Sequence, residues 1–379
     1  MLHVHRIERP EEFDSVAPAW DALLRPDDPC APFLGPAWIR TWFAAYGGDA
    51  RLHVLVARDG DSLCGVLPLG ETRPRFAGIR LRSLELLANG HAPCADLVAR
   101  TGMEAAVRNA FVRHLQDGDP TWDTLTCAEV RDGAHLVAVH AAFPLMQRDA
   151  QLQRESPYIE LQGDWNGFRS HLSRNFQRVL RNNRNRMTRA GQTKIELLED
   201  PAAITAALPD LFAIGERSWQ GSEGSAVGSN AANRNFYAGL ARELGSRGWL
   251  RVWFLQLEGR RIAFEFHVAH AGVEFGLKTG YDRDFESIGA GTFLDQCIVE
   301  RLFDEGRWRE YDLLGNADFY KRRWTALVRP HRRLLGFGTR GTGRLVSRWN
   351  LRLKPVLKQV RDQMRPAPGA APEAETEPT

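Results

Sequence analysis

Residues 274–280 (EFGLKTG) and Tyr281-Asp282 are followed by Gly289-Ala290-Gly291 and by a helical pattern over 292–305. The first run has the composition of a strand, the last has the spacing of a helix, and glycines lie between them. A helix that begins at such a loop presents free backbone N–H groups, and its dipole favours negative charge. The pattern predicts a phosphate-binding loop, although two glycines before a helix are also ordinary loop residues.

The same order of elements occurs twice along the chain. Hairpins are predicted at 52–69 and 249–269, and each is followed by a strand, a helix, a glycine-containing turn and a strand that opens with Trp122 or Trp308. This repetition predicts a duplicated α/β unit. The first copy has the sequence RTGME at 100–104 with a single glycine, so only the second copy is expected to bind phosphates.

Length and composition indicate an ordinary globular protein. The chain has 379 residues, 43% hydrophobic residues and a net charge of +3, which favours two domains and no global polyanion partner. Five cysteines without a CxxC pair predict buried free thiols in a reducing compartment and no zinc site. No signal peptide and no apolar run long enough to span a bilayer is found, so we expect a cytoplasmic protein.

The motif residues of the second half resemble those of a known family. They are Tyr281-Asp282, Gly289 with Gly291, Asp312, Gly315 and Tyr320-Lys321. Over residues 10–340 the chain resembles the GNAT-fold acyltransferases grouped with CelD-type cellulose biosynthesis proteins, which are related to Fem-type aminoacyl transferases. The resemblance implies an α/β (α+β), tandem GNAT-like acyl-CoA N-acyltransferase fold, with mixed central sheets flanked by helices.

The resemblance also implies a division of the chain. We expect a degenerate N-terminal GNAT-like lobe over 1–155, an acyl-CoA-binding lobe over 156–340, a peripheral basic helix over 341–364 and a disordered tail over 365–379. The implied activity is transfer of an acyl group from acetyl-CoA or another acyl-CoA to an amine or hydroxyl (EC 2.3.1.-). The implied context is exopolysaccharide or cell-envelope biosynthesis, with a small molecule or glycan precursor as acceptor.

The acyl-CoA is expected to lie with its pantetheine arm between two central strands and its pyrophosphate on the glycine loop. The residues predicted to contact it are Lys278, Tyr281, Gly289, Ala290, Gly291 and Thr292.

Two ionisable residues alternate on the strand IAFEFHV of the second hairpin. Period-two spacing places Glu265 and His267 on one face and Phe264 and Phe266 on the other. Acyl transfer to an amine needs a base for the amine and an acid for the departing thiolate, and Glu, His and Tyr can supply both. We therefore predict Glu265, His267 and Tyr320 as catalytic residues; a solvated outer face is the alternative for the first two.

Four further residues are predicted to contact the acceptor. Glu216 and Trp219 lie one helical turn apart beside a Gly/Ser-rich loop, although simple packing of the tryptophan explains them equally well. Asp312 lies in an apolar run, and its alternative role is to bind the backbone of the loop after Gly315. Lys321 can contact phosphate or carboxylate, or can be an ordinary exposed helix charge.

A basic helical stretch over 168–190 carries seven arginines, among them Arg178 and Arg181 at i,i+3 spacing. Three interpretations remain open: a solvated face, a site for an anionic acceptor or an acyl carrier protein, and a nucleic-acid contact. The last is disfavoured because aromatic residues are not interleaved and the net charge is low. We assign Arg178 and Arg181 to substrate binding.

The sequence lacks the motifs typical of nucleophilic catalysis, ATP binding and metal binding. The GxSxG nucleophile pattern, the phosphate-binding P-loop of ATPases and any metal-ligand cluster are absent, so direct transfer without a metal is expected. Two alternatives are kept: a non-catalytic module that binds an anionic partner, and a Fem-like aminoacyl transferase that uses charged tRNA. Strong salt-dependent RNA binding would distinguish the second.

Overall fold

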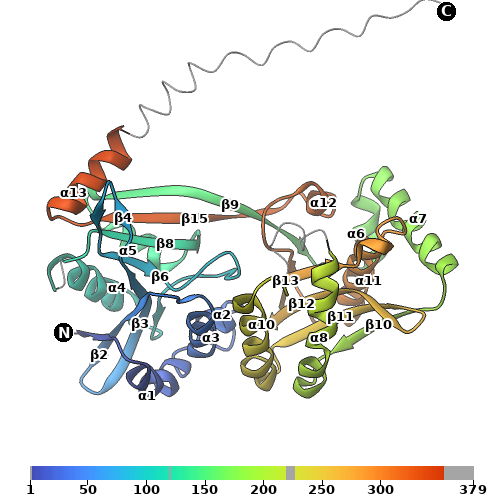
Figure 1. The fold of residues 1–379 in the computed structure, drawn as a ribbon, viewed down its shortest axis with the longest axis horizontal. Coiled ribbons are helices and arrows are strands. Elements are labelled where there is room, and N and C mark those ends of the chain that lie inside the picture. Colours follow the sequence, from blue (N-terminus) through green and yellow to red (C-terminus); the bar gives the residue numbers. More distant parts are fainter. Residues whose placement is uncertain (1, 119–120, 219–226, 354–379) are drawn as a thin grey trace, which may run out of the picture.

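The computed structural model describes residues 2–118, 121–218 and 227–353 (Figure 1). In these ranges a mixed sheet runs through the molecule in the order β1-β2-β3-β6-β8-β15-β9-β14-β13-β12-β11-β10. The strands are β1 (His3–Ile7), β2 (Arg51–Asp59), β3 (Ser62–Thr72), β4 (Arg75–Phe76), β5 (Ile79–Arg80), β6 (Ser83–Leu86), β7 (Val98–Ala99), β8 (Thr124–Arg131), β9 (Arg148–Glu160), β10 (Thr193–Leu198), β11 (Leu250–Leu257), β12 (Arg260–His270), β13 (Val273–Tyr281), β14 (Glu310–Asp312) and β15 (Val328–Phe337).

Helices cover both faces of this sheet (Figure 1). The α-helices are α1 (Pro10–Asp21), α2 (Ala31–Leu34), α3 (Pro36–Tyr46), α4 (Glu104–Arg113), α5 (His135–Ala141), α6 (Trp165–His171), α7 (Arg174–Ala190), α8 (Pro201–Arg217), α10 (Ala231–Glu243), α11 (Ala290–Glu305), α12 (Phe319–Arg322) and α13 (Gly341–Arg348). Short 3₁₀ or π turns are η1 (His114–Gly118), η2 (Leu145–Gln147), η3 (Gly245–Arg247), η4 (Arg283–Phe285) and η5 (Trp349–Leu353).

The two halves repeat one arrangement, as the sequence predicted. In the first half the hairpin β2–β3 is followed by β6, α4 and β8, and β6 pairs with β8 in parallel. In the second half the hairpin β11–β12 is followed by β13, α11 and β14, and β13 pairs with β14 in parallel. The helix between two parallel strands is the crossover that such a pair requires.

A long two-stranded ribbon joins the halves. Strand β15 pairs with β9 from Val328↔Pro157 to Gly336↔Arg148 and with β8 on its other edge, while β9 also pairs with β14. The boundary that we placed between residues 155 and 156 therefore falls inside β9. Residues 328–337, which we assigned to the second lobe, complete the sheet of the first. In β9 only Ser156, Pro157 and Ile159 are buried, so the strand carries little hydrophobic signal in the sequence.

The halves also share a hydrophobic core. Trp38 of α3 packs edge-on against Phe236 of α10 with ring centroids 5.3 Å apart, and Phe33 packs against Phe275 of β13 at 5.0 Å. This core lies on one face of the second-half sheet under α8 and α10, and a separate core lies on the other face under α7 and α11. The face that carries α11 is the one on which Glu265 lies.

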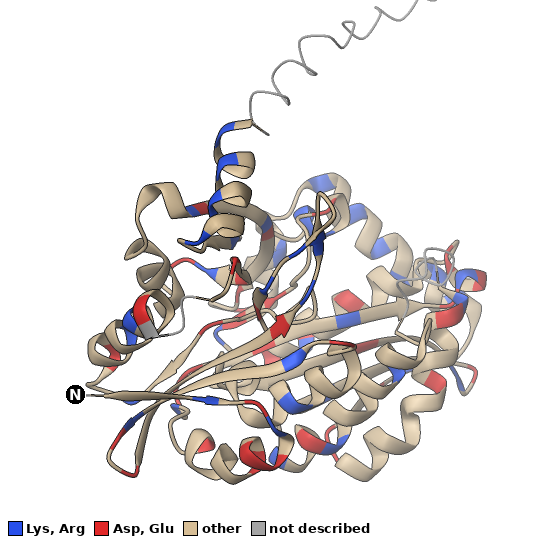
Figure 2. Ribbon diagram, turned by 60° about the vertical axis from the view of Figure 1, so that its left-hand side comes forward, with Lys and Arg blue, Asp and Glu red and all other residues tan. Residues whose placement is uncertain are grey.

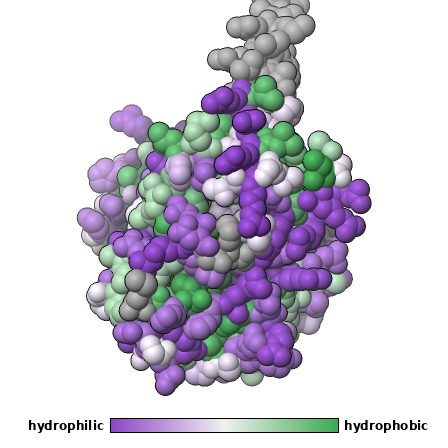
Figure 3. Space-filling view, turned by 90° about the vertical axis from the view of Figure 1, so that its left-hand side faces the viewer, coloured by the Kyte–Doolittle hydropathy of each residue, from purple (hydrophilic) through white to green (hydrophobic). Residues whose placement is uncertain are grey.

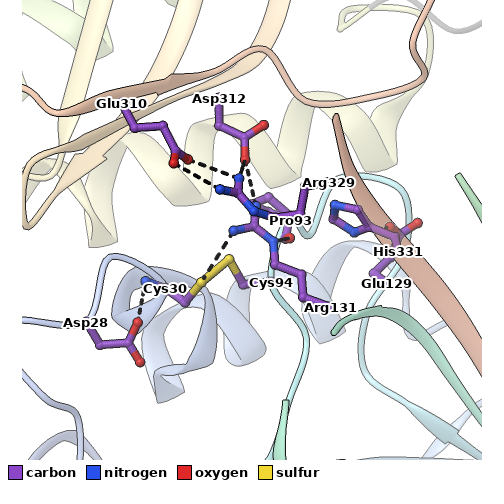
Figure 4. Close-up of a disulfide and its surroundings, with 10 residues drawn as sticks. All are labelled: Asp28, Cys30, Pro93, Cys94, Glu129, Arg131, Glu310, Asp312, Arg329 and His331. Carbon is purple, nitrogen blue, oxygen red and sulfur yellow. Dashed lines mark hydrogen bonds and ion pairs between the residues drawn. A yellow bond between two sulfur atoms is a disulfide. The ribbon is translucent and has the colours of Figure 1, made fainter. Parts of the chain in front are cut away.

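The prediction of five free thiols was wrong. Cys30 and Cys94 form a disulfide with Cα atoms 5.8 Å apart across a sequence separation of 64, whereas Cys64, Cys127 and Cys297 are free (Figure 4). Sequence spacing alone could not reveal the pair, because the fold brings the two segments together. Among the described residues, no helix is both long and apolar enough to cross a membrane.

Part of the predicted C-terminal organisation can be placed. The basic segment that begins at 341 starts with α13 and continues through η5 to Leu353. Residues 354–379, which include the tail predicted as disordered, lie outside the described residues.

Candidate active site

The parallel strands β13 and β14 separate shortly after they pair. They are in register at Val273↔Glu310, Glu274↔Tyr311 and Phe275↔Asp312; β14 then ends, while β13 continues to Tyr281. A cavity of about 270 Å³ opens where they part. Its walls include residues 276–279 of β13 and residues 313–316 after β14. The geometry therefore provides a slot between two central strands, with backbone on both sides.

The floor of this cavity carries Glu265 above a buried hydrogen-bonded chain. His267 contacts Glu265 Oε2 through Nε2 at 2.7 Å and Glu274 Oε1 through Nδ1 at 2.6 Å. Arg251 donates to the other oxygen of Glu274 at 2.5 Å, and all four side chains are buried. The predicted alternation is correct, because the extra residue of the bulge at Phe266/His267 lies on β13. The alternative of a solvated face is wrong.

This chain fixes the protonation of its members. Burial lowers the pKa of His267, but hydrogen bonds and charge from Glu265 and Glu274 outweigh it and raise the pKa to about 9. Burial raises the pKa of Glu265, yet the hydrogen bond and charge of His267 more than offset this, and the pKa is lowered. His267 is therefore an imidazolium at neutral pH. It is fully buried and does not line the cavity, so it positions Glu265 and does not itself face substrate, in contrast to the predicted catalytic role.

Two residues that we did not predict complete the acidic floor. Tyr311 donates a hydrogen bond to Glu265 Oε2 at 2.8 Å. Asp295 of α11 also lines the cavity, and burial together with the charge of Glu265 raises its pKa well above the ordinary value. One sequence signal was available: Asp295 occupies the same helical stripe as the buried Val299 and Leu302, where a carboxylate is unexpected.

Cationic and phenolic groups face this floor. Lys278, Tyr320 and Lys321, all predicted as site residues, line the cavity. Burial lowers the pKa of each lysine to about 8, and for Lys278 the charge of Lys321 adds to this effect. Burial and nearby carboxylates raise the pKa of Tyr320, so its phenol stays protonated. Lys321 Nζ donates to the carbonyl of Leu314 at 2.5 Å, which holds the ammonium over the end of β14.

The first half contributes to the same cavity. Gly90 and His91 line it, and the His91 ring stacks on Tyr46 with centroids 5.4 Å apart. His91 Nδ1 contacts the hydroxyl of Tyr237 at 3.2 Å. Burial, with the nearby charges of Lys278 and Arg154, lowers the pKa of His91 to about 4, so the imidazole is neutral. No local pattern in the sequence could connect His91 with residues about two hundred positions away.

The glycine loop forms the N-terminus of α11, as predicted. Gly289 is the N-cap with φ +76°, and no side chain caps the helix. A Cβ on Gly289 would collide with Asn183 of α7, and one on Gly291 would lie 2.8 Å from the ring of Tyr281. Only hydrogen atoms fit at these two positions, and of the first helical residues Ala290 is buried whereas Gly291 and Thr292 are partly exposed. In the first half the corresponding turn is closed, since Glu104 accepts from Gly102 N at 3.0 Å.

Some predicted substrate contacts lie elsewhere. Asp312 is fully buried, and its carboxylate binds Arg131 and Arg329 (Figure 4). Its backbone partner is Leu314, before Gly315 and not after it as predicted, so a structural role with different partners is favoured over direct contact. Glu216 is exposed on α8 near Arg234, at 3.7 Å. Neither lines the cavity.

The remaining predicted contacts also lie outside the cavity lining. Arg178 and Arg181 point from the solvent face of α7, opposite its buried Phe176 and Leu180. Tyr281 and the loop residues 289–292 border the far end of β13 and are not part of the cavity wall. Trp219 lies outside the described residues.

Comparisons with known proteins agree with this geometry. The family described as acetyltransferase (GNAT) domain matches residues 174–322. A search of curated proteins found no match. The solved structure of FemX has a TM-score of 0.55 at 8% identity, covering 87% of this chain and 96% of its own.

Two further structures are similar. L-PGS from Bacillus licheniformis gives a TM-score of 0.51 at 13% identity, with 90% and 96% of the chains covered. A conserved protein of unknown function from Bacteroides thetaiotaomicron has a TM-score of 0.53 at 13% identity, and the match covers 88% of this chain and 100% of its own. At such identities the likeness concerns the fold alone. The chain thus has a tandem GNAT-like fold, and its second half matches the GNAT acetyltransferase domain.

Proposed function

We propose that the protein is an acyltransferase that moves an acyl group from acyl-CoA to an amine or hydroxyl by direct attack in a ternary complex. The observation that carries this proposal is the cavity between the separating strands β13 and β14, floored by Glu265 and Asp295. The match of residues 174–322 to the GNAT domain supports it. The finer assignment to CelD-like enzymes and a glycan-precursor acceptor rests on the sequence resemblance.

The acyl-CoA donor would lie along this slot. The pantetheine arm would lie between the strands, where the backbone of residues 276–279 can hydrogen-bond its amides. The pyrophosphate would bind the N–H groups of Gly291 and Thr292, which are partly exposed, because an uncapped helix N-terminus attracts anions. Lys278 belongs to the stretch of β13 that lines the slot and would add a positive charge there.

The chemistry follows from the protonation states. The acceptor nitrogen or oxygen attacks the thioester carbonyl carbon, the C–S bond breaks, and the acyl group is transferred. Glu265, held ionised by His267, accepts the proton of the acceptor. Tyr320, held neutral, donates a proton to the departing thiolate. Asp295, Lys278 and Lys321 line the same cavity and would orient the acceptor.

Calorimetric titration of the purified protein with acetyl-CoA, longer acyl-CoAs and free CoA tests the proposal. Saturable binding is expected, and Gly291→Glu should abolish it by adding bulk and negative charge at the phosphate position. Thr292→Glu adds the charge without the collision with Tyr281. Gly341→Glu places the same charge at the start of α13, where a Cβ meets no neighbour, and serves as the control.

The outcomes separate the alternatives. Binding that both loop variants abolish and Gly341→Glu retains supports the donor site. Absence of binding to every CoA compound, or undiminished binding by the folded loop variants, would overturn it. Transfer from a charged tRNA or an acyl carrier protein in place of acyl-CoA would favour the Fem-like alternative or the carrier-protein donor.

A further inference from the structure

Helix α13 lies at the opposite end of the molecule from α11 (Figure 1), and exposed apolar side chains gather around it. Six of the large exposed hydrophobic residues among the described residues lie on α13–η5, on η2 and on the β4–β5 hairpin. They are Ile79, Leu145, Met146, Leu345, Trp349 and Leu353. Leu145 is 75% exposed and Leu353 53%. Figure 3 shows hydrophobic (green) groups among hydrophilic (purple) ones on this part of the surface, next to the grey atoms.

These three segments are in contact with one another. The Ser347 hydroxyl donates to the carbonyl of Met146 at 2.5 Å, and the Trp349 ring lies 6.1 Å from the ring of Phe76. Val346 packs in a small core with Leu81 and belongs to the inner side of the helix. The outer side therefore presents apolar groups on a surface that the fold holds together.

The same surface is strongly basic. Arg344, Arg348 and Arg352 repeat every fourth residue beside Leu345, Trp349 and Leu353. Arg75, Arg80 and Arg340 add to them, all six arginines are exposed, and none of them forms an ion pair among the described residues. Residues 340–353 and 73–82 contain no acidic residue. Figure 2 shows this run of blue on the coil that leads to the grey trace.

We propose that this apolar–basic surface, formed by α13–η5, η2 and the β4–β5 hairpin, binds the surface of an anionic lipid bilayer. Arginines beside exposed Leu and Trp match such a surface, because the cations meet lipid phosphates while the apolar groups enter the acyl boundary. A nucleic acid would leave the aliphatic groups without a partner. A second copy about a two-fold axis would bring the surface against itself, with arginine facing arginine.

The inference is independent of the acyl-transfer proposal, since none of the residues of this surface lines the cavity. The test is flotation of the full-length protein with vesicles of phosphatidylcholine alone or mixed equally with phosphatidylglycerol. Binding is expected only with phosphatidylglycerol and should weaken at high salt. Replacing Arg344, Arg348 and Arg352 by Gln should weaken binding about fivefold per charge, or on the order of 100-fold together.

Matched variants keep the proposal falsifiable. Leu345→Ser with Trp349→Ser should lower binding at least about tenfold, whereas Phe319→Ser, which removes an 82% exposed ring from the other half, should not. Replacing Arg174, Arg181 and Arg189 of α7 by Gln controls for total charge. Equal binding to both vesicle types, no binding, an equal loss in the α7 variant, or a switch from dimer to monomer in the α13 variants would each overturn the proposal.

Discussion

Replacement of Asp312 by asparagine tests how the two halves of the molecule are joined. Asp312 Oδ2 accepts hydrogen bonds from Arg131 of β8 at 2.8 Å and from Arg329 of β15 at 2.9 Å, and Oδ1 accepts from Leu314 N at 3.0 Å (Figure 4). The carboxylate is fully buried, and the Arg131 side chain is 15% exposed. Asparagine keeps the size and the bond to Leu314 but removes the charge.

The magnitude follows from these contacts. Each hydrogen bond to a charged group contributes about 1.5–3 kcal/mol, and breaking a buried ion pair by removing one partner costs about 3–5 kcal/mol. Arg329 keeps Glu310 as a partner, with contacts at 2.9 and 3.0 Å, whereas Arg131 has no second carboxylate partner among the described residues. We expect Asp312→Asn to lower the free energy of unfolding by about 3–5 kcal/mol.

Urea denaturation, followed by tryptophan fluorescence at constant pH, measures this change. Asp132→Asn is the control, because Asp132 is 50% exposed in its pair with Arg332 and should lose less than about 1 kcal/mol. The double variant Arg131→Met with Asp312→Leu should lose less than Asp312→Asn alone, since no charge stays buried without a partner. A near-unchanged stability together with a raised KM for the acceptor would refute the reasoning and restore a substrate contact.

Three further predictions concern the site and the disulfide. Glu265→Gln and Tyr320→Phe should each lower kcat by roughly 10²–10⁴-fold with acyl-CoA affinity retained in calorimetry; an unchanged kcat contradicts the assigned roles. Reducing Cys30–Cys94, which are 64 residues apart, should lower the free energy of unfolding by about 4 kcal/mol in urea titrations with and without dithiothreitol; coincident curves would exclude the bond. The raised pKa of His267, about 9, gives stability that is fully present below about pH 6.5 and lost as the pH rises through 9. Relative to His267→Gln, the wild-type free energy of unfolding should therefore fall by about 3 kcal/mol from pH 6 to pH 10, and parallel pH curves would disprove this.

Local patterns predicted the parts of the site that lie on one element. The spacing of Glu265 and His267 placed both on one face of β12, and Gly289 marked the start of α11. These predictions hold because strand alternation and helix capping depend on neighbouring residues only. The role of His267 could not be read in this way, since its burial between two carboxylates depends on Glu274 of the next strand.

Residues from distant segments required the fold. His91, Asp295 and Tyr311 reach the cavity from the first half, from α11 and from β14, and the pairing of β9 with β15 decides where the halves meet. The secondary-structure elements, the repeated α/β unit and the glycine loop before α11 could be predicted from the sequence, because each depends on local periodicity and turn chemistry. The tertiary structure alone decided which carboxylates stay ionised, which cysteines pair and which strands separate, because these depend on long-range burial and contacts.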